Sequence, residues 1–180
     1  MGEKTYYKVF FDNINRLVNS ISEEALNKLK RKIKNSKRII FIGNGGSNAI
    51  AMHLQIDFFK RLNKETISIS SAPLLTCLVN DFKKNEEFTQ FVKLCNVNDE
   101  DILFVISSSG KSDNIRNLLV YLHNDAELKP FTVFIHGFEK ENLYNRYADL
   151  TIYFDSSNYG EVEIASETII HAIIEDVVKN

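Results

Sequence analysis

Five short runs of apolar residues between residues 38 and 154 constrain this chain more than any other feature of its sequence. Each run is four to six residues long, which suits a strand that is buried on both faces of a sheet. Stretches with helical spacing of apolar residues separate most of these runs. We therefore predict strands at residues 38–42, 66–69, 101–106, 131–135 and 149–154.

The spacing of apolar residues predicts helices in the segments between and around these strands. Ser22 is a candidate N-cap for the second helix. The alternation of strands and helices predicts a doubly wound α/β sheet with helices on its faces. The first two helices precede the sheet and need a surface to pack on, for which another subunit is one candidate. The expected helices span 4–18, 22–33, 47–62, 73–79, 85–94, 112–122 and 162–178.

Length and charge set limits on the class of protein. A chain of 180 residues, 44% of them hydrophobic, favours a single domain with a sizeable core. The net charge of −2 gives no electrostatic reason to expect binding to nucleic acid or to a membrane surface. No apolar run approaches the ~20 residues that a membrane helix needs. We therefore expect no nucleic-acid partner and no membrane partner.

The cysteines and the N-terminus indicate where the protein works. Cys77 and Cys95 stand among apolar residues outside any CxxC pair, and we predict buried free thiols in a reducing compartment. Residues 1–4 lack the charged-then-apolar pattern of a signal peptide. Together these features predict a soluble cytoplasmic protein.

Two polar loops follow two of the predicted strands. The first is Gly43-Asn44-Gly45-Gly46-Ser47, and the second is Ser107-Ser108-Ser109-Gly110-Lys111-Ser112. In open α/β sheets, ligands bind beyond the carboxyl ends of the strands. Glycines let the backbone approach a ligand, and a helix that starts in each loop offers free amides to an anion. Either loop alone could be a simple connection, but both at the same edge of one sheet predict a phosphate site.

Two better-known phosphate motifs do not fit. A dinucleotide-binding loop needs a third glycine, and that position is Asn48. A nucleoside-triphosphate loop needs a glycine five residues before Gly110, and that residue is Val105.

Four motifs in order resemble the sugar isomerase (SIS) domain, most closely its phosphoheptose isomerase branch. The likeness runs from about residue 38 to the end of the chain. The motifs are Phe41-Ile42-Gly43-Asn44-Gly45-Gly46-Ser47, Ala51-Met52-His53, Val79-Asn80-Asp81-Phe82 and Ile106-Ser107-Ser108-Ser109-Gly110-Lys111-Ser112.

The resemblance implies a fold and an assembly. The fold would be a three-layer α/β structure with a doubly wound, five-stranded parallel sheet and two N-terminal helices. Residues 1–180 would form one SIS domain, with oligomerisation helices in 1–36 and the phosphosugar-binding core in 37–180. The assembly would be a homotetramer with active sites at subunit interfaces.

The resemblance also implies site residues and a cofactor. Ser47, Ser107, Ser109 and Ser112 would bind the phosphate, with Ser108 beside them. The substrate site would further include Asn44, Gly45, Gly46, Asp81 and Glu163. Zinc would be bound by His53, Asp57, Glu163 and His171.

The residues themselves partly support this metal site. His53 and Asp57 stand four apart on a predicted helix and so share one face, which suits chelation. Asp57 replaces the usual Glu of the family, and Glu163 replaces the usual Gln. Glu163 and His171 are separated by eight residues, a rise of ~12 Å in a continuous helix, so Glu167 is a spare candidate. A histidine in an apolar stretch, such as His171, is also often a core residue without a ligand.

Our leading hypothesis is a phosphoheptose isomerase. It would convert D-sedoheptulose 7-phosphate to D-glycero-D-manno-heptose 7-phosphate through an enediol and feed heptose synthesis for surface carbohydrates. Asp57 would take the carbon-bound proton, His171 would move the oxygen-bound proton, and zinc would polarise the carbonyl. Glu163 is the next base if the metal occupies Asp57.

Two other hypotheses stay open. The chain could isomerise a different sugar phosphate, or it could be a non-catalytic SIS-domain binding protein of the kind that associates with a replication initiator. A sugar-phosphate-sensing regulator is disfavoured, since the chain has neither the length nor the basic patch for a DNA-binding domain.

Overall fold

A computed structural model describes residues 5–127 and 129–179 of the chain. Its centre is a sheet of five strands in the order β2-β1-β3-β4-β5, and every neighbouring pair is parallel. This confirms the predicted doubly wound parallel sheet. The strands are β1 (Arg38–Gly43), β2 (Glu65–Ser68), β3 (Ile102–Ser107), β4 (Phe131–His136) and β5 (Leu150–Tyr153).

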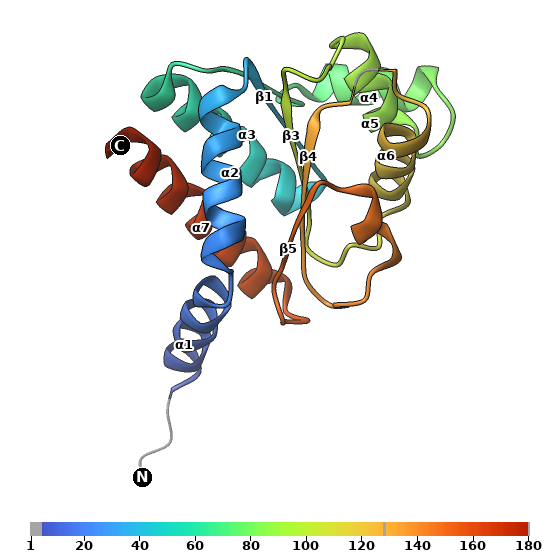
Figure 1. Cartoon of the computed structure of the whole chain (residues 1–180). Coiled ribbons are helices and arrows are strands. Elements are labelled where there is room, and N and C mark those ends of the chain that lie inside the picture. Colours follow the sequence, from blue (N-terminus) through green and yellow to red (C-terminus); the bar gives the residue numbers. More distant parts are fainter. Residues whose placement is uncertain (1–4, 128, 180) are drawn as a thin grey trace.

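Helices cover both faces of the sheet and complete three layers (Figure 1). One layer holds α1 (Tyr6–Asn19), α2 (Glu23–Asn35), α3 (Gly45–Leu62) and α7 (Tyr159–Lys179). The other holds α4 (Ala72–Asp81), α5 (Glu87–Leu94) and α6 (Asp113–Asn124).

Alternation along the central strands divides the core into two halves. Phe41 and Phe104 are register partners on β1 and β3, point to the α3–α7 side, and stack with ring centroids 4.9 Å apart. Ile40 and Val105 point to the α4–α6 side. Both faces of these strands are apolar because helices cover both, which explains their continuous apolar runs.

The two N-terminal helices belong to the same core as the sheet. Leu17 of α1 and both Leu29 and Ile33 of α2 are fully buried against β1, α3 and α7. The predicted cap of α2 is present, since Ser22 Oγ accepts a hydrogen bond from the Ala25 amide at 3.2 Å. The predicted start of the first helix at Lys4 and the prediction drawn from the sequence of residues 1–4 lie outside the described residues.

Three details differ from the prediction. α3 begins two residues early, at Gly45, whose φ of +51° suits a glycine. α7 begins at Tyr159 because Asn158 accepts hydrogen bonds from the Glu161 and Val162 amides, through its side chain and its carbonyl. A short 3₁₀ helix, η1 (Leu143–Tyr147), precedes β5 and was not predicted.

The prediction of two buried thiols was wrong for Cys77. This side chain is exposed on α4 and donates a hydrogen bond to Asp81 Oδ2 at 3.1 Å, which raises the pKa of the thiol. The four-residue spacing within α4 places both groups on one helix face. Cys95 is half-buried, and burial raises the pKa of its thiol.

None of the helices within the described residues is long and apolar enough to cross a membrane.

A buried ion pair ties the start of β1 to the turn before β3. The Asp101 side chain has 0% exposure and accepts two hydrogen bonds from Arg38, one from Nη2 at 2.6 Å and one from Nε at 2.9 Å. The Asn98 amide donates to the same carboxylate at 2.9 Å. Arg38 also donates to the carbonyls of Cys95 and Asn96, so the pair organises the whole turn.

Replacing Asp101 with Ala should strongly destabilise the fold. The change leaves the Arg38 guanidinium with only carbonyl acceptors and the Asn98 amide without its carboxylate acceptor, and breaking a buried pair in this way costs about 3–5 kcal/mol. Urea denaturation followed by circular dichroism would measure the free energy of unfolding.

The matched control is Glu100→Ala. Glu100 joins the same two segments through Lys37, but both side chains are more than 60% exposed, so the loss should stay within about 1 kcal/mol. Equal losses in the two variants would contradict the role given to the buried pair.

Candidate functional site

A cavity of about 310 Å³ lies where β1 and β3 end. It contains all but one of the substrate-site residues predicted from the sequence. The lining residues are Asn44, Gly45, Gly46, Ser47, Ser107, Ser108, Ser109, Ser112, Tyr159 and Glu163. The two loops, some sixty residues apart in sequence, therefore form one pocket, which we call the serine pocket.

The serine pocket offers donors to an anion without any basic side chain. Its lining contains no lysine or arginine. Helices α3 and α6 both begin at the pocket, and neither Asn44 nor Ser112 caps its own helix through its side chain. The Ile115 amide of α6 is taken by Asn114 Oδ1, but the N-cap side chains leave the other first-turn amides to a ligand, and both helix dipoles favour a negative charge here. Hydroxyl groups complete the donor set, with Ser47 Oγ 3.5 Å from Ser108 Oγ.

Glu163 lines one side of the pocket, and its carboxylate occupies space that is open only because residue 46 is a glycine. Ser108 Oγ donates to Glu163 Oε1 at 3.4 Å. A Cβ atom added to Gly46 would lie 2.5 Å from the same carboxylate oxygen, so any larger residue at 46 would displace this side chain. Gly46 therefore leaves room for the Glu163 carboxylate at the pocket.

The structure adds one residue to the predicted set and leaves one outside. Tyr159, the first residue of α7, lines the pocket and was missed because the helix was predicted to begin later. Asp81 does not line the pocket. It ends α4 as an exposed residue, and hydrogen bonds from Asn80 and Cys77 lower the pKa of its carboxyl group.

A second group of polar side chains lies between α3 and α7. His171 Nδ1 is 3.2 Å from Asp57 Oδ2, and His53 Nε2 is 3.9 Å from the same oxygen. One ligand atom from each of these three residues lies within 4.8 Å of the others. Glu167 Oε1 is 3.9 Å from Nε2 of both histidines. We call these four residues the His–Asp cluster.

Glu163 does not join this cluster. α7 is continuous from Tyr159 to Lys179, so Glu163 and His171 are about 12 Å apart along the axis. Glu167, one turn before His171, occupies the place beside the histidines instead. The structure thus divides the two carboxylates, with Glu163 in the serine pocket and Glu167 in the His–Asp cluster.

The donors of the cluster could hold a metal ion. Imidazole nitrogens and a carboxylate oxygen are common zinc ligands, and three protein ligands are typical of catalytic zinc sites. The half-exposed His53 leaves the cluster open to solvent.

The serine pocket and the His–Asp cluster lie on the same two helices. α3 and α7 run in the same direction, and pairs between them occur in the same order along both. From the pocket outward these are Gly46 with Glu163, His53 with Glu167, Asp57 with His171, and Arg61 with Glu175.

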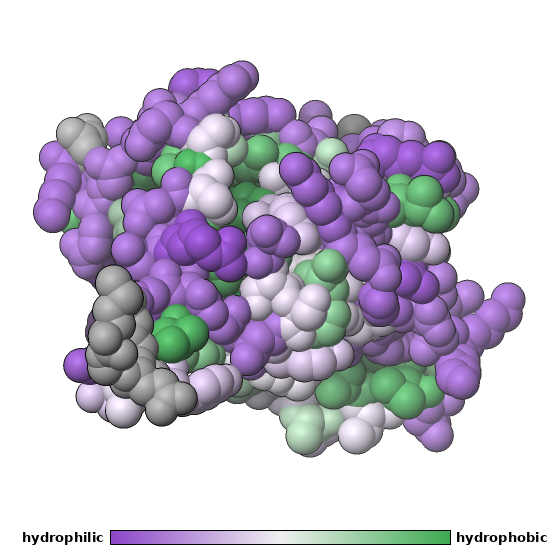
Figure 2. Space-filling view, turned by 90° about the horizontal axis from the view of Figure 1, so that it is seen from below, coloured by the Kyte–Doolittle hydropathy of each residue, from purple (hydrophilic) through white to green (hydrophobic). Residues whose placement is uncertain are grey.

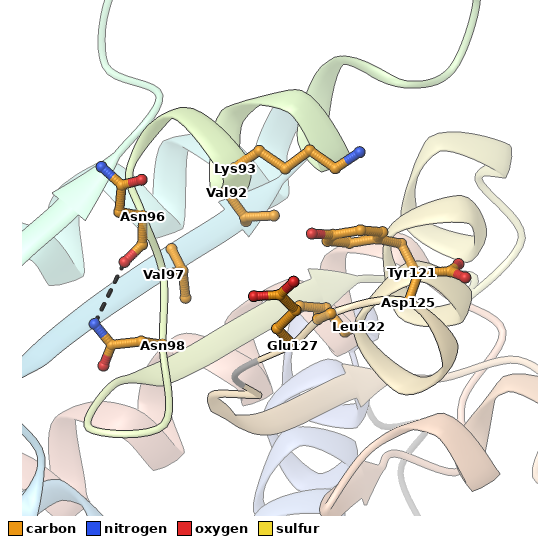
Figure 3. A pocket seen from close by; sticks show the side chains of 10 residues that line it. Val92, Lys93, Asn96, Val97, Asn98, Tyr121, Leu122, Asp125 and Glu127 are labelled. Atoms are coloured by element: carbon orange, nitrogen blue, oxygen red, sulfur yellow. Dashed lines mark hydrogen bonds between the residues drawn. The ribbon is translucent and has the colours of Figure 1, made fainter.

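A larger cavity of about 640 Å³ lies away from these residues (Figure 3). Side chains from the end of α5, such as Lys93, and from the end of α6, such as Tyr121, point toward it. Asn96, Val97 and Asn98 precede β3, so this cavity is at the amino end of the strand, opposite the serine pocket. It contains none of the predicted site residues.

Comparisons with known proteins agree with this architecture. The sequence model of a family described as the SIS domain matches residues 8–125. A phosphoheptose isomerase of Fusobacterium nucleatum is 32% identical over 119 residues, 61% of this chain and 61% of that relative. One from Glaesserella parasuis is 33% identical over 103 residues, 54% of this chain and 53% of that relative. The alignments thus span less than two thirds of either relative.

A solved structure has the same fold over nearly the whole chain. A phosphoheptose isomerase from Neisseria gonorrhoeae superposes with a TM-score of 0.83 at 17% identity, covering 97% of this chain and 96% of that one.

Replacing Glu163 with Gln should tighten the binding of inorganic phosphate. Gln has nearly the same shape, so packing on Gly46 persists, but the negative charge beside the bound anion is removed. Two charges a few ångströms apart in water repel by about 1 kcal/mol, so we expect the Kd to fall roughly fivefold. Titration calorimetry would measure it.

Glu167→Gln is the matched control, because Glu167 is one turn further along α7 and outside the pocket lining. Its effect on phosphate affinity should be smaller. Unchanged or weaker binding in Glu163→Gln would show that phosphate does not bind beside Glu163.

Proposed function

The chain belongs to the SIS domain family, and on that basis we propose that it is an aldose–ketose isomerase of sugar phosphates. The proposed reaction converts D-sedoheptulose 7-phosphate to D-glycero-D-manno-heptose 7-phosphate. The relatives described above are named phosphoheptose isomerases, which supports this substrate. The observation that carries the proposal is the position of an anion pocket and an acid–base cluster on the same pair of helices.

The nearest residues of the His–Asp cluster are within reach of a long sugar phosphate, and Asp57 and His171 are one turn further along their helices. Ser47 in the pocket and His53 in the cluster are six residues apart on α3, a rise of about 9 Å. Six C–C bonds of about 1.5 Å each, advancing roughly 1.25 Å per bond, place C1 of an extended heptose ~7.5 Å from C7. The reacting carbons C1 and C2 are at the end opposite the phosphate on C7. A triose phosphate would span less than half of this separation.

The proposed binding mode follows from the pocket. Ser47, Ser107, Ser109 and Ser112 would hold the phosphate together with the free amides of α3 and α6, and Ser108 would stand beside them. Asn44 and Glu163 offer hydrogen-bonding groups to the sugar hydroxyls. Gly45 and Gly46 let the backbone approach the ligand closely.

The proposed acid–base roles belong to the His–Asp cluster. Isomerisation moves a proton between adjacent carbons and another between their oxygens. Asp57 would remove the carbon-bound proton, and His171, whose Nδ1 is 3.2 Å from Asp57 Oδ2, would move the oxygen-bound proton. Glu163, on the pocket side, is the remaining carboxylate if Asp57 serves as a metal ligand.

We propose that His53, Asp57 and His171 would hold a zinc ion and that Glu167, rather than Glu163, would be its fourth ligand. A bound zinc ion supplies Lewis-acid polarisation of the substrate carbonyl and hydroxyl. Glu167 Oε1 is 3.9 Å from Nε2 of both His53 and His171, and His53 Nε2 is 3.9 Å from Asp57 Oδ2, which supports this choice.

His171→Ala provides the test of the proposed activity. Incubation with sedoheptulose 7-phosphate, with and without added zinc, should yield a heptose 7-phosphate with the wild-type protein. The variant should lose turnover, because it lacks the oxygen-proton carrier, and lose bound zinc in a metal assay. Its affinity for inorganic phosphate should remain within about twofold, since the serine pocket is unchanged. Full turnover in His171→Ala would overturn the assignment.

We further propose a homotetramer with active sites at subunit interfaces. Met52, Ile56 and Phe59 form an exposed apolar stripe along α3, beside His53 and Asp57. Phe59 is 63% exposed. Exposed Tyr6, Tyr7 and Phe11 on α1 add apolar surface, and hydrophobic patches reach the surface on the side from which Figure 2 is drawn. Large exposed apolar side chains on α1 and α3 support an interface on these helices, and residues 1–36 would contribute to it.

Phe59→Glu should disrupt this assembly. A buried charge in an apolar interface has no partner, so we expect smaller species by light scattering and a parallel loss of turnover. Lys60→Glu, one residue away on the same helix, places the same charge outside the stripe and should leave the assembly intact. A Phe59→Glu protein that is still tetrameric would exclude this stripe from the interface.

Two further features of the function remain proposals. The free thiols of Cys77 and Cys95 suit a reducing compartment, and we propose that the protein works in the cytoplasm. The product would feed heptose synthesis for surface carbohydrates.

A further inference from the structure

A chain of three polar side chains links the serine pocket to a buried carboxylate outside it. Asn44 lines the pocket, and its side chain pairs with the side chain of Asn114 on α6. Asn114 Nδ2 also donates to Glu87 Oε1 at 2.7 Å. Glu87 is the first residue of α5, is 9% exposed, and does not line the pocket. The hydrogen bond to Glu87 therefore connects the pocket to a residue outside both phosphate loops.

The hydrogen bonds of Asn114 are fully used. Its two N–H groups donate to Glu87 Oε1 and, at 3.0 Å, to Asn44 Oδ1. Its carbonyl oxygen accepts from Asn44 Nδ2 at 2.9 Å and from the Ile115 amide at 2.9 Å. This exhausts the donors and acceptors of an amide side chain, so Asn114 has no freedom to turn without losing a bond.

The Glu87 carboxylate and the Ile115 amide together set the orientation of the Asn114 side chain, and through it that of Asn44. A carboxylate offers only acceptors, so the Asn114 NH₂ group must face Glu87. The Asn114 oxygen then faces Asn44, so the Asn44 NH₂ group must donate the hydrogen bond to it. One Asn44 N–H and one oxygen lone pair are left over. A side-chain amide without such a partner can present either end to a ligand.

The hydrogen bonds between Asn44 and Asn114 also fix the distance between the two loops. Asn44 directly precedes α3, and Asn114 is the second residue of α6, two residues after Ser112. Their reciprocal pair joins segments that are 70 residues apart in sequence. Because each loop supplies part of the anion site, a fixed separation preorganises both halves before the ligand arrives.

We propose that Glu87 is a positioning residue of the serine pocket. It orients Asn114, and through it Asn44, so that Asn44 presents a fixed N–H and oxygen to the sugar phosphate and the two loops keep their spacing. The inference rests on the proposed function, because it assigns the ligand of the pocket to that substrate class. Glu87 acts through Asn44 and touches neither substrate nor reacting atoms.

Glu87→Met removes the acceptor while filling a similar volume. Calorimetric titration with sedoheptulose 7-phosphate in a His171→Ala background measures binding without turnover. Loss of one oriented hydrogen bond should weaken the affinity about tenfold. Glu87→Gln keeps one acceptor oxygen and should restore most of the affinity. Glu86→Met is the matched control, since Glu86 is adjacent and its carboxylate accepts from Gln90 instead.

A double-mutant cycle separates positioning from general damage. In an Asn44→Ala background, Glu87→Met should have little further effect on affinity, because its route to the ligand is already gone. Asn114→Ala breaks this series of hydrogen bonds at a half-buried amide and should reproduce the loss even if Glu87→Met folds poorly. Full affinity in Asn114→Ala, or an undiminished effect of Glu87→Met in the Asn44→Ala background, would overturn the inference.

A readout without ligand keeps the two proposals distinguishable. Hydrogen exchange should rise in residues 43–47 of Glu87→Met but not of Glu86→Met, although neither glutamate touches that loop. A wild-type protein that binds neither sedoheptulose 7-phosphate nor inorganic phosphate would overturn the proposed function. The exchange comparison would still decide the role of Glu87, and equal exchange in the two variants would reject it.

Discussion

The parallel direction of all five strands is the constraint on which the rest of this structure depends. It brings every strand's carboxyl end to one edge of the sheet, so the loops after β1 and β3 meet there although they are far apart in sequence. It also forces α3 and α7, which pack on the same face, to run in the same direction. The first turn of α3 and the first two turns of α7 then meet at the serine pocket, and the third and fourth turns of both helices meet at the His–Asp cluster.

The electrostatics of the site follow from this arrangement. Two helix N-termini and a set of hydroxyls supply the positive potential, so the pocket can bind a phosphate without a lysine or an arginine in its lining. Without a lysine or an arginine in its lining and with Glu163 beside the anion, such a pocket would bind a phosphate with moderate affinity. An enzyme that must release a phosphorylated product can benefit from moderate affinity, because tight uniform binding does not raise kcat. The Glu87–Asn114–Asn44 chain adds geometric definition without adding charge.

Particular elements show which parts of the fold and the site could be predicted from the sequence. The apolar runs predicted all five strands because the helices on both faces make each strand apolar throughout. The glycine and serine loops predicted the pocket because parallel strands have only one carboxyl edge. The start of α7 was placed too late, since the Asn158 cap gives no apolar signal, and Tyr159 was missed with it. Cys77 was predicted to be buried because its neighbours are apolar, but it lies on the exposed side of α4.

The sequence by itself determined the class of fold, the two loops and the types of group available for acid–base and metal chemistry. These depend on the period of apolar residues and on local backbone freedom, which neighbouring residues decide. The tertiary structure alone decided which carboxylate goes where. Glu163 and Glu167 are one helical turn apart and look interchangeable in the sequence, but the contact of α7 with Gly46 and His53 sends one to the pocket and the other to the histidines. It likewise decided that Glu87, Asn114 and Asn44 form one chain, because three helix starts meet at a single edge of the sheet.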